Sequence, residues 1–461
     1  MNYREALDWL YGFSDSERTG HFVHDREDNL RRERTLLAAL GNPHRAYGVT
    51  HVAGTKGKGS TSAMIASMLR AGGLRVGLYT QPDLHTFRER MQINGVPISE
   101  EDVVCLVPEL RDALTAIGQA VGSYITYEIA TALAFLYFQR AGAQHAVVEV
   151  GLGGRLDATN VVKPIVAVIT SISYDHMQVL GNTLSAIATE KAGIIKPGVP
   201  TVCSAQAPEA QAVIARVAAE RHARLLTVGP SGSGAVYTYR AGHFNDQSQW
   251  FTVSGPDEDY QDLELGLLGE HQIENATAAI AAIETLRASG VAIDEQAMRT
   301  GLRQVRWPAR LQVAGEKPLL VVDGAHNADS LARLLAALQR HFVYGRLVLV
   351  LGMMADKDLA GMAEVLGSAR LDSIVATAAS NKRSLPPEEI ARAMALVALD
   401  VRTLVAPTIP EALTTALALA GADDCICVTG SLYVAAEALR WFAAHGGARV
   451  MHPINIDGVD H

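Results

Sequence analysis

The chain has 461 residues, of which 49% are hydrophobic and 19% are charged, and its formal net charge is −9. A chain of this length exceeds one ordinary hydrophobic core, so we expect two or three domains, and the composition excludes a disordered protein. The negative charge, without any run of lysine or arginine, argues against a nucleic-acid or membrane-surface partner.

Three features of the sequence indicate a cytoplasmic protein. The N-terminal segment MNYREALDWLYGF carries Arg4, Glu5 and Asp8 among its apolar residues, so it lacks the apolar stretch of a secretory signal. No later segment approaches the ~20 apolar residues that a membrane span needs. The four cysteines form neither a CxxC pair nor a zinc spacing, which favours buried or idle thiols in a reducing compartment. They are Cys105, Cys203, Cys425 and Cys427.

In the first 172 residues, short apolar runs rich in β-branched residues alternate with longer helical patterns. Strands that are apolar almost throughout are buried on both faces, so the alternation predicts a parallel sheet covered by helices. The expected strands are 49–54, 75–80, 145–151 and 165–172, and the expected helices include 62–72 and 128–142.

The pattern changes between about 235 and 268, where AVYTYR, SQWFTV and DLELGLLG follow one another without helices. This stretch predicts a small antiparallel insertion, and a helical pattern returns at 271–304. The segment WPAR then interrupts it, because Pro308 disfavours a helix through that point.

A second series of strands and helices begins after Pro308. Its apolar runs are PLLVVDGAH, RLVLVLGMM, SIVATAA, TLVAP and DCICVTGSL, each followed by a helical pattern. The sequence therefore predicts two α/β domains, residues 1–308 and 309–461, with a hinge near 306–316.

A glycine-rich segment, HVAGTKGKGS, ends the first expected strand and opens a helix. Gly54, Gly57 and Gly59 let the backbone bend tightly and bring N–H groups close to an anion, and the helix N-terminus adds its dipole. Lys58 would reach the β- and γ-phosphates of a nucleotide, and Ser60 would meet a magnesium ion. The alternative is a simple glycine-rich turn capped by Ser60.

The segment EVGLGGRLDATN follows another apolar strand directly. Glu149 at the end of that strand, beside a phosphate loop, is placed to hold magnesium through oxygen. Alone, Glu149 fits a solvated carboxylate at a strand tip equally well. The glycines that follow it, at 151, 153 and 154, favour a ligand because they indicate close backbone approach.

The block SISYDHMQVLGNTLSAIATEKAGIIKPG contains three residues that bear on a site or on a helix start. His176 follows a buried strand, and a single histidine in this position is either a structural residue or a metal ligand. Thr183 is expected to cap the next helix. Lys191 lies beside Glu190, where the plain alternative is an exposed salt-bridging pair of little energetic weight.

These three blocks together resemble the folylpolyglutamate synthase and dihydrofolate synthase family, a branch of the Mur ligase superfamily. The resemblance runs in one order from about residue 35 to 440. It implies a P-loop ATPase domain on a parallel sheet with a small antiparallel insertion, and a second, smaller Rossmann-like α/β domain. The other blocks that carry it are YTQPDLHTFRER, ITYEIAT, GEHQIENATAAI, WPAR, DGAHN, GMMADKD and TGSLY.

The resemblance implies that the protein uses ATP and Mg²⁺ and that Lys58, Lys191 and His176 serve catalysis. In related enzymes the lysine at the place of Lys191 is carbamylated, which is reasonable because a buried lysine that loses its proton can add carbon dioxide. Asn275 would contact the nucleotide, although a helix cap is its plain alternative. The implied nucleotide contacts are Gly54, Thr55, Gly57, Lys58, Gly59, Ser60, Asn275, Arg310, Asp323 and His326. The implied metal ligands are Ser60, Glu149, His176 and Gln81.

The resemblance also implies an acceptor site and a site for the incoming amino acid. Asp157 matches the aspartate that contacts the pterin, and Tyr127 takes the place of an aromatic residue that stacks on the pterin, though core packing is an equal alternative. Lys357 and Ser431 would help hold the incoming glutamate or a phosphate. The implied substrate contacts are Pro82, Tyr127, Asp157, Arg155, Lys357 and Ser431.

The chain departs from the family pattern at three places. Lys56 stands where asparagine usually precedes the GKGS sequence, which adds positive charge to the loop. Gln81-Pro82-Asp83 replaces the usual Ser-Pro-His, and Ala309 replaces the glycine of a WPGR-type segment. A glutamine oxygen can still bind magnesium, whereas Asp83 brings a charge to the place of a ring.

The implied function is an ATP-dependent ligase that phosphorylates a carboxylate and lets the amine of glutamate attack the acyl phosphate. The acceptor would be dihydropteroate, an already glutamylated folate, or both, and the RLDATN segment favours both. The small-molecule partners would be ATP, glutamate and the folate, and the protein would act as a monomer. The alternatives are a peptidoglycan Mur ligase, a P-loop NTPase switch or motor, and an inactive relative that binds folate or nucleotide.

Overall fold

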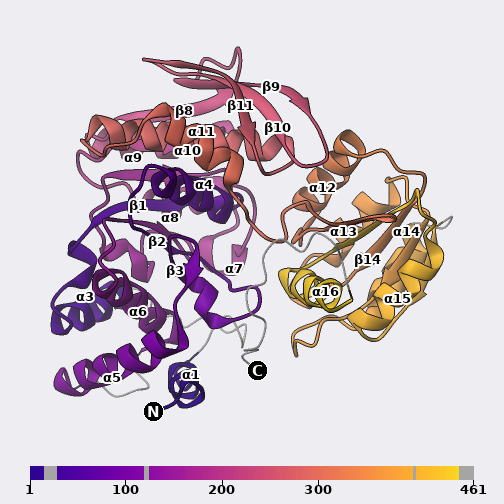
Figure 1. The fold of residues 1–461 in the computed structure, drawn as a ribbon, viewed down its shortest axis with the longest axis horizontal. Helices are drawn as coiled ribbons and strands as arrows, with labels where there is room; N and C mark the ends of the chain where they lie inside the picture. The colour runs from indigo at the N-terminus through magenta and orange to yellow at the C-terminus, as the bar shows by residue number, and fades with distance from the viewer. Residues whose placement is uncertain (15–27, 119–123, 398–400, 446–461) are drawn as a thin grey trace.

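The computed structural model describes residues 1–14, 28–118, 124–397 and 401–445. It consists of two α/β parts, each built on its own sheet, which lie side by side in Figure 1. The larger part, on the left, is N-terminal, and the smaller part, on the right, is C-terminal. The predicted fold class is therefore confirmed.

The large sheet has eleven strands in the order β11-β10-β9-β8-β7-β6-β1-β5-β2-β3-β4. Its middle is parallel from β8 to β2, and β1 lies between β5 and β6, so the ends of these three strands meet at one edge. The strands are β1 (Gly48–Ala53), β2 (Val76–Tyr79), β3 (Met91–Ile93), β4 (Val96–Pro97), β5 (His145–Glu149), β6 (Val166–Ile169), β7 (Thr201–Cys203), β8 (Leu225–Pro230), β9 (Tyr237–Phe244), β10 (Gln249–Ser254) and β11 (Asp259–Leu265).

The expected antiparallel segment is present as β9, β10 and β11, but it is not a separate insertion. Its first strand pairs in parallel with β8, with Val228 opposite Tyr237, so the segment continues the main sheet. The antiparallel pairs β9–β10 and β10–β11 then extend the sheet to its edge. The sequence pattern did not mark β7 and β8 as strands, because β7 has only three residues and β8 ends in Gly-Pro, a pair typical of a turn.

Helices cover both faces of the large sheet, and several begin where a side chain caps the first turn. Thr183 accepts a hydrogen bond from the Ala186 N–H at 3.1 Å, as its position predicted. These helices are α1 (Tyr3–Tyr11), α3 (Asn29–Ala39), α4 (Lys58–Ala71), α5 (Glu100–Ala116), α6 (Thr126–Arg140), α7 (Met177–Leu180), α8 (Leu184–Ala192), α9 (Pro208–Glu220), α10 (Glu270–Ala288) and α11 (Glu295–Gln304).

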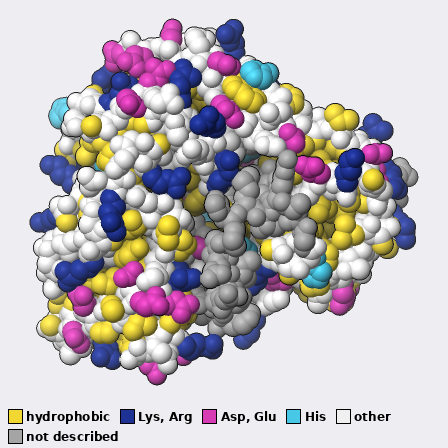
Figure 2. Space-filling view, in the orientation of Figure 1, with side chains coloured by type: hydrophobic (Ala, Val, Ile, Leu, Met, Phe, Trp, Pro, Cys, Tyr) yellow, Lys and Arg dark blue, Asp and Glu magenta, His cyan; other side chains and the backbone are white. Residues whose placement is uncertain are grey.

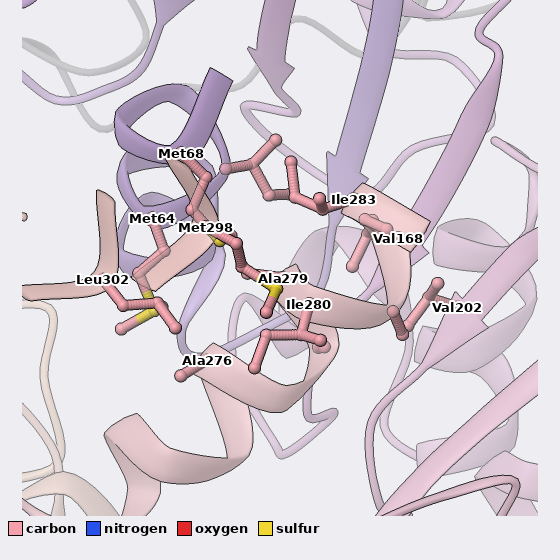
Figure 3. Close-up of a cluster of buried hydrophobic side chains, with 14 of the residues drawn as sticks. Met64, Met68, Val168, Val202, Ala276, Ala279, Ile280, Ile283, Met298 and Leu302 are labelled. Atoms are coloured by element: carbon pink, nitrogen blue, oxygen red, sulfur yellow. The ribbon is translucent and has the colours of Figure 1, made fainter. Parts of the chain in front are cut away.

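One face of the sheet holds the helix that follows the phosphate loop. Figure 3 shows Met64 and Met68 of α4 packed with Leu302 of α11 and Ile280 of α10. The approach of α11 to α4 is close, because a Cβ at Gly301 would overlap the Met68 backbone. The Ser67 hydroxyl donates to the Gly301 carbonyl at 2.8 Å, which fixes this crossing. The packing sets the position of α4 and of the loop at its start.

The second sheet has six strands in the order β12-β13-β17-β14-β15-β16. All pairs are parallel except β12–β13, and β12 occupies part of the segment 306–316 that was expected as a hinge. The elements are β12 (Gln312–Glu316), β13 (Leu319–Val322), α12 (Ala328–His341), β14 (Leu347–Leu351), α13 (Leu359–Gly367), β15 (Ser373–Ala376), α14 (Pro387–Val397), β16 (Arg402–Val405), α15 (Ile409–Leu419), β17 (Cys425–Thr429) and α16 (Leu432–Ala444).

The two parts touch through β9 and the start of α10 on one side and α12 on the other. The Arg340 guanidinium pairs with Glu270 at 2.8 Å, and its Cζ lies 5.9 Å from the Phe244 ring centre. His341 meets the same ring edge-on at 4.6 Å. These contacts orient the small sheet toward the phosphate loop.

On the face in view in Figure 2, basic and acidic side chains are interspersed rather than segregated. Within the described part of the chain, none of the helices is both long and apolar enough to cross a membrane. All four cysteines are free thiols, and three are buried: Cys203, Cys425 and Cys427.

Candidate active site

The phosphate loop connects β1 to α4 at the carboxyl edge of the large sheet. Gly57 caps α4 in the left-handed region, with φ of 86°, and Gly54 has φ of 147°. A Cβ at Gly54 would overlap Thr170, and one at Gly57 would overlap the Asn275 side chain. Only glycine fits these two positions, so the loop is shaped as the motif predicted.

The amide groups of the loop divide into two sets. The N–H groups of Thr55 and Lys56 donate to the Ser171 carbonyl at 2.9 and 3.2 Å. The first turn of α4, residues 58–60, carries N–H groups that have no partner within the helix. The backbone N–H groups left to meet an anion are therefore those at the start of α4, whereas the N–H groups of Thr55 and Lys56 shape the loop. Ser60 lies inside the helix and is buried, so the alternative of a turn capped by Ser60 is wrong.

Two ionisable side chains face each other beneath this loop. Lys58 Nζ lies 3.9 Å from Glu149 Oε1 and 3.4 Å from the Thr55 carbonyl. Glu149 is only 4% exposed, so the alternative of a solvated carboxylate is wrong. Burial raises the pKa of Glu149 to about 7, against the opposing effects of the Lys58 charge and the Gln81 backbone N–H. Its Oε2 has no hydrogen-bond partner among the described residues.

Lys191 enters the same region from α8. It is 4% exposed, and its ammonium donates to the Gly54 carbonyl at 2.7 Å. Burial, and then the charge of Lys58, lowers the pKa of Lys191 to about 7. Glu190 pairs with Arg155 at 2.9 Å rather than with Lys191. The alternative of an exposed Glu190–Lys191 pair is therefore wrong.

His176 lies at the start of α7 with left-handed backbone, φ of 48°. Its side chain is 40% exposed, and Nε2 is 3.8 Å from Asp175 Oδ1. Burial lowers the pKa of His176 to about 4, so the ring is neutral and able to accept a metal at pH 7. Within the described ranges, no group of three or more His, Cys, Asp or Glu side chains converges as a metal site would.

The expected acceptor patch is a closed network of hydrogen bonds. The Asp157 carboxylate accepts from the Tyr127 hydroxyl at 2.9 Å, from the N–H groups of Gly151 and Leu152 at 3.1 and 3.0 Å, and from Thr159. The Gly151 N–H also donates to the Tyr127 hydroxyl at 3.1 Å. Asp157 therefore fixes the Tyr127 ring and the glycine turn after β5.

The loop after β2 lies beside this network. Gln81 packs closely against Gly151: a Cβ added at Gly151 would overlap the side-chain amide of Gln81. The Gln81–Pro82 peptide bond is cis. The extra charge of Asp83 is matched by Arg90 at 2.5 Å. Asp83 thus stabilises the loop in which it lies.

The C-terminal part presents a second set of side chains to the loop. Asp323 accepts from the N–H groups of Leu311 and Ala325, both at 2.8 Å, and so ties β13 to the segment before β12. His326 Nδ1 bonds the Gly324 carbonyl at 2.9 Å, while Nε2 lies 3.2 Å from Lys56 Nζ. The lysine can only donate, so Nε2 is an acceptor and Nδ1 carries the proton.

The other predicted residues of the site differ in the hydrogen bonds that they already make within the protein. Asn275 lies within α10, bonds Gln272 at 3.0 Å and contacts the phosphate loop, so it is not a helix cap. Arg310 Nη1 donates to the Ala309 carbonyl at 2.8 Å, and its charge acts on both Asp323 and Glu149. Ser431 caps α16 by accepting from the Val434 N–H, and it is buried.

Sequence reasoning missed two contacts across the cleft. Lys56, noted only as extra charge, reaches His326 of the other part. Asp175 stands between Lys56 and Lys357, which lies after β14. The adjacency of Asp175 to His176 was the available signal, but its partners are 119 and 182 residues away in the chain and leave no local pattern.

Two segments of the chain match known protein families. Residues 52–283 match the Mur ligase middle domain, and residues 309–432 match the Mur ligase glutamate ligase domain. With the glycine loop between β1 and α4, these matches define a ligase of the Mur type.

Individual relatives narrow the class. The dihydrofolate synthase/folylpolyglutamate synthase of Bacillus subtilis is 39% identical over 363 residues, which cover 78% of this chain and 81% of the relative. Folylpolyglutamate synthase of Mycobacterium tuberculosis complexed with ADP matches with a TM-score of 0.86 and 32% identity, over 95% of this chain and 98% of that one. An FPGS–AMPPCP–folate complex matches with a TM-score of 0.80 and 36% identity, over 95% of this chain and 98% of that one. The chain belongs to the dihydrofolate synthase/folylpolyglutamate synthase family, and the predicted family and ligase class are confirmed.

Proposed function

We propose that the protein adds L-glutamate to the carboxylate of dihydropteroate, of a folyl-glutamate, or of both, with ATP as the energy source. The observation that carries this proposal is the meeting of Lys58, Lys191 and Glu149 beneath a glycine loop. Glu149 and Lys191 are buried, Lys58 is 18% exposed, and one oxygen of Glu149 has no hydrogen-bond partner among the described residues, as is usual for a group that awaits a charged ligand. The relatives whose complexes hold ADP, AMPPCP and folate support the nucleotide and the acceptor.

The reaction needs activation, because a carboxylate and an amine do not form an amide at pH 7 by themselves. The acceptor carboxylate attacks the γ-phosphorus of ATP, ADP leaves, and an acyl phosphate remains. The glutamate amine then attacks the acyl carbon, and inorganic phosphate leaves. Lys58 and the N–H groups at the start of α4 stabilise the negative charge of the phosphoryl group in flight. Catalysis in this scheme is positioning and electrostatics.

Mg²⁺ fits the chemistry of the residues present. Glu149 Oε2 is a buried carboxylate oxygen for which the described part of the chain supplies no hydrogen-bond partner, and oxygen is the ligand that this ion prefers. We infer that Glu149, Ser60, His176 and Gln81 would hold the ion, directly or through water. When bound, the ion neutralises phosphate charge, a task that Lys58 alone cannot complete.

We also propose that Lys191 acts either as the amine or as its carbamate. The lowered pKa leaves a large fraction of the amine neutral near pH 7, and the neutral amine is the form that adds carbon dioxide. A carbamate at this position would be an anion beside Lys58. It would then orient a phosphoryl group or the magnesium ion.

The C-terminal part would complete the nucleotide site. Arg310, with its planar guanidinium, is suited to bind a phosphate when the parts close, while Asp323 and His326 would contact ribose or adenine. Asn275 supports the same assignment from the opposite side of the loop. Closure excludes water, which otherwise hydrolyses the acyl phosphate.

The acceptor site would include Tyr127, Pro82 and Arg155. Asp157 holds the Tyr127 hydroxyl, which leaves the ring face for a flat pterin. Arg155 is 48% exposed, so its charge remains accessible to an anionic glutamyl tail. These features support activity on both acceptors.

We propose the domain boundary between residues 308 and 309. The two sheets have separate cores, and within the described ranges the chain passes between them once, through the segment that contains Pro308. We also propose that the protein acts as a monomer.

The test is to incubate the purified protein with ATP, Mg²⁺ and glutamate, and to add dihydropteroate or tetrahydrofolate in separate reactions. We expect ADP release that requires both acceptor and glutamate, with a mass gain of one glutamate in each acceptor. Gain with one acceptor assigns the protein to that activity alone. ATP turnover that ignores glutamate would instead support a P-loop switch, and ATP binding without product would support an inactive relative.

A further inference from the structure

The loop between β2 and β3 connects the proposed acceptor site with the C-terminal part of the molecule. We define the acceptor loop as residues 81–86. At its start, Gln81 packs against Gly151, and a Cβ at Gly151 would also overlap the Tyr127 side chain. The backbone N–H of Gln81 donates to the Glu149 carboxylate. The start of the acceptor loop therefore lies beside both the proposed metal ligand and the proposed acceptor site.

The interior of the acceptor loop is held by one carboxylate, that of Glu89, which is 9% exposed. This carboxylate accepts from the N–H groups of Leu84, His85 and Thr86 at 2.8, 3.2 and 3.3 Å. A capping box accounts for the bond to Thr86, because its acid reaches back to the N-cap residue. The other two bonds extend to the middle of the loop. Successive N–H groups that converge in this way form a concave site for an anion, and Glu89 fills that site from within the chain.

The outer side of the acceptor loop contacts the C-terminal part. Leu84 packs against the hydrophobic cluster of that part that contains Phe442. Burial, and then the charge of Arg440 on α16, lowers the pKa of His85 to about 4, so His85 also lies close to the C-terminal part. Phe87, next to the loop, is fully buried in a core cluster of the N-terminal part. The acceptor loop is therefore fixed to both parts of the molecule.

We propose that Glu89 and Leu84 are positioning residues for the acceptor, which act through the acceptor loop rather than by contact with the substrate. Glu89 sets the path of the loop from within, and Leu84 sets its position against the C-terminal part. Together they hold Gln81 beside Tyr127 and fix the backbone at Pro82. The inference rests on the proposed function and adds two residues that determine acceptor affinity from outside the acceptor site.

The test compares acceptor binding with nucleotide binding in matched variants. Glu89→Gln keeps the size of the side chain but replaces one acceptor oxygen by an NH₂ group, which only donates. Glu5→Gln is the matched control, because Glu5 closes an exposed capping box at the start of α1. Leu84→Ala removes the contact with the C-terminal part, and Leu84→Met restores a side chain of similar volume. The measured constants are the KM values for ATP, for glutamate and for the acceptor that the unaltered protein glutamylates.

We expect Glu89→Gln to raise the KM for the acceptor by about tenfold, the loss expected for hydrogen bonds to a charged group. Leu84→Ala should raise the same constant by about fivefold, and Leu84→Met should stay within about twofold of the unaltered protein. The KM for ATP should change by less than about threefold in every variant, because the start of α4 is untouched. Glu5→Gln should change none of the constants. The rise in melting temperature on adding ATP reports whether each variant is folded.

Two results overturn the inference. An unchanged KM for the acceptor in either Glu89→Gln or Leu84→Ala would show that the loop is not held as proposed. A lower melting temperature with equal changes in all three KM values would show that the two residues only support the fold.

A failure of the proposed function can be told apart from a failure of this inference. If the unaltered protein shows no glutamate-dependent ADP release, the proposed function fails. Calorimetric binding of dihydropteroate and of tetrahydrofolate to the same variants then decides the inference, because binding needs no turnover. Weaker binding in Glu89→Gln and Leu84→Ala, but not in Glu5→Gln, supports it, and equal binding or no binding at all overturns it.

Discussion

The phosphate loop and the acceptor patch are built from similar polar residues, but they differ in how those residues are bonded. Beneath the loop and among the described residues, one oxygen of Glu149 has no hydrogen-bond partner, and the contacts of Lys58 with the Thr55 carbonyl and Glu149 are long, at 3.4 and 3.9 Å. In the patch, the Asp157 carboxylate is fully occupied by Tyr127, Thr159 and the glycine turn. Since burial of an unpaired polar group is costly, the first arrangement persists for a ligand and the second for its own stability.

This contrast separates residues that bind from residues that position. Lys58, Lys191 and Glu149 are expected to act on the reacting groups, so their loss should lower turnover. Asp157 is expected to act through Tyr127, so its loss should change acceptor binding and stability. Each prediction below tests one side of the contrast.

The largest effect should come from Lys58→Met, which removes the cation closest to the phosphate position. We expect turnover to fall by about 10²–10³-fold, the usual cost of losing one group that stabilises developing charge. The measurement is glutamate-dependent ADP release at saturating substrates. Lys163→Met, at an exposed lysine, is the matched control and should retain full turnover. A loss below tenfold in Lys58→Met would place the phosphate elsewhere.

Lys191→Gln should lower turnover by about 10²-fold, because an uncharged amide replaces either the amine or the carbamate. Added acetate should restore part of the activity of Lys191→Ala if the working form is the carbamate, since acetate supplies a similar anion. Glu190→Gln, one residue away, should keep its activity, because Glu190 pairs only with the exposed Arg155. Equal losses in Glu190→Gln and Lys191→Gln would point to disruption of α8.

Substitutions in the acceptor patch should have smaller effects than those at the phosphate loop, and these effects should appear in the KM for the acceptor. Tyr127→Leu removes the flat ring, and we expect the KM for dihydropteroate to rise by about tenfold. Tyr127→Phe keeps the ring and loses the bonds of the hydroxyl to Asp157 and to the Gly151 N–H, so the rise should stay within about threefold. Steady-state kinetics with both acceptors measure the two constants. Equal effects would show that the hydroxyl, rather than the ring, contacts the acceptor.

Sequence alone predicted the parts of the site that depend on local order. Strand, glycine loop and helix follow one another within HVAGTKGKGS, so the place of Lys58 could be inferred from spacing. The burial of Lys191 could not, because it depends on the Gly54 carbonyl 137 residues away. The same limit hid the β8–β9 pairing and the contact of Lys56 with His326, which long-range packing decides.

Glu33 tests the contrast between the two regions most directly, because its carboxylate is incompletely bonded like that of Glu149, although Glu33 lies near the acceptor patch. It lies on α3, next to the acceptor patch, is fully buried, and neither carboxylate oxygen has a partner among the described residues. Burial raises its pKa well above the ordinary value of 4.5, and the charges of Glu128 and Asp157 raise it further. Burial therefore favours the protonated form of Glu33, and Glu33 lies outside the proposed phosphate site.

The raised pKa makes stability depend on pH in a defined direction. Between 4.5 and the folded-state pKa, the folded protein holds a proton on Glu33 that the unfolded chain releases, so the free energy of unfolding falls as pH rises through this window. Glu33→Gln removes that dependence. We expect it to stabilise the protein by about 1–3 kcal/mol at pH 8 relative to its effect at pH 4.5, with turnover unchanged. Urea unfolding at the two pH values measures the difference. If Glu33→Gln instead abolishes ligation with dihydropteroate, then Glu33 binds the acceptor. A buried acid with an unsatisfied oxygen would then mark a ligand site both at the phosphate loop and at the acceptor patch.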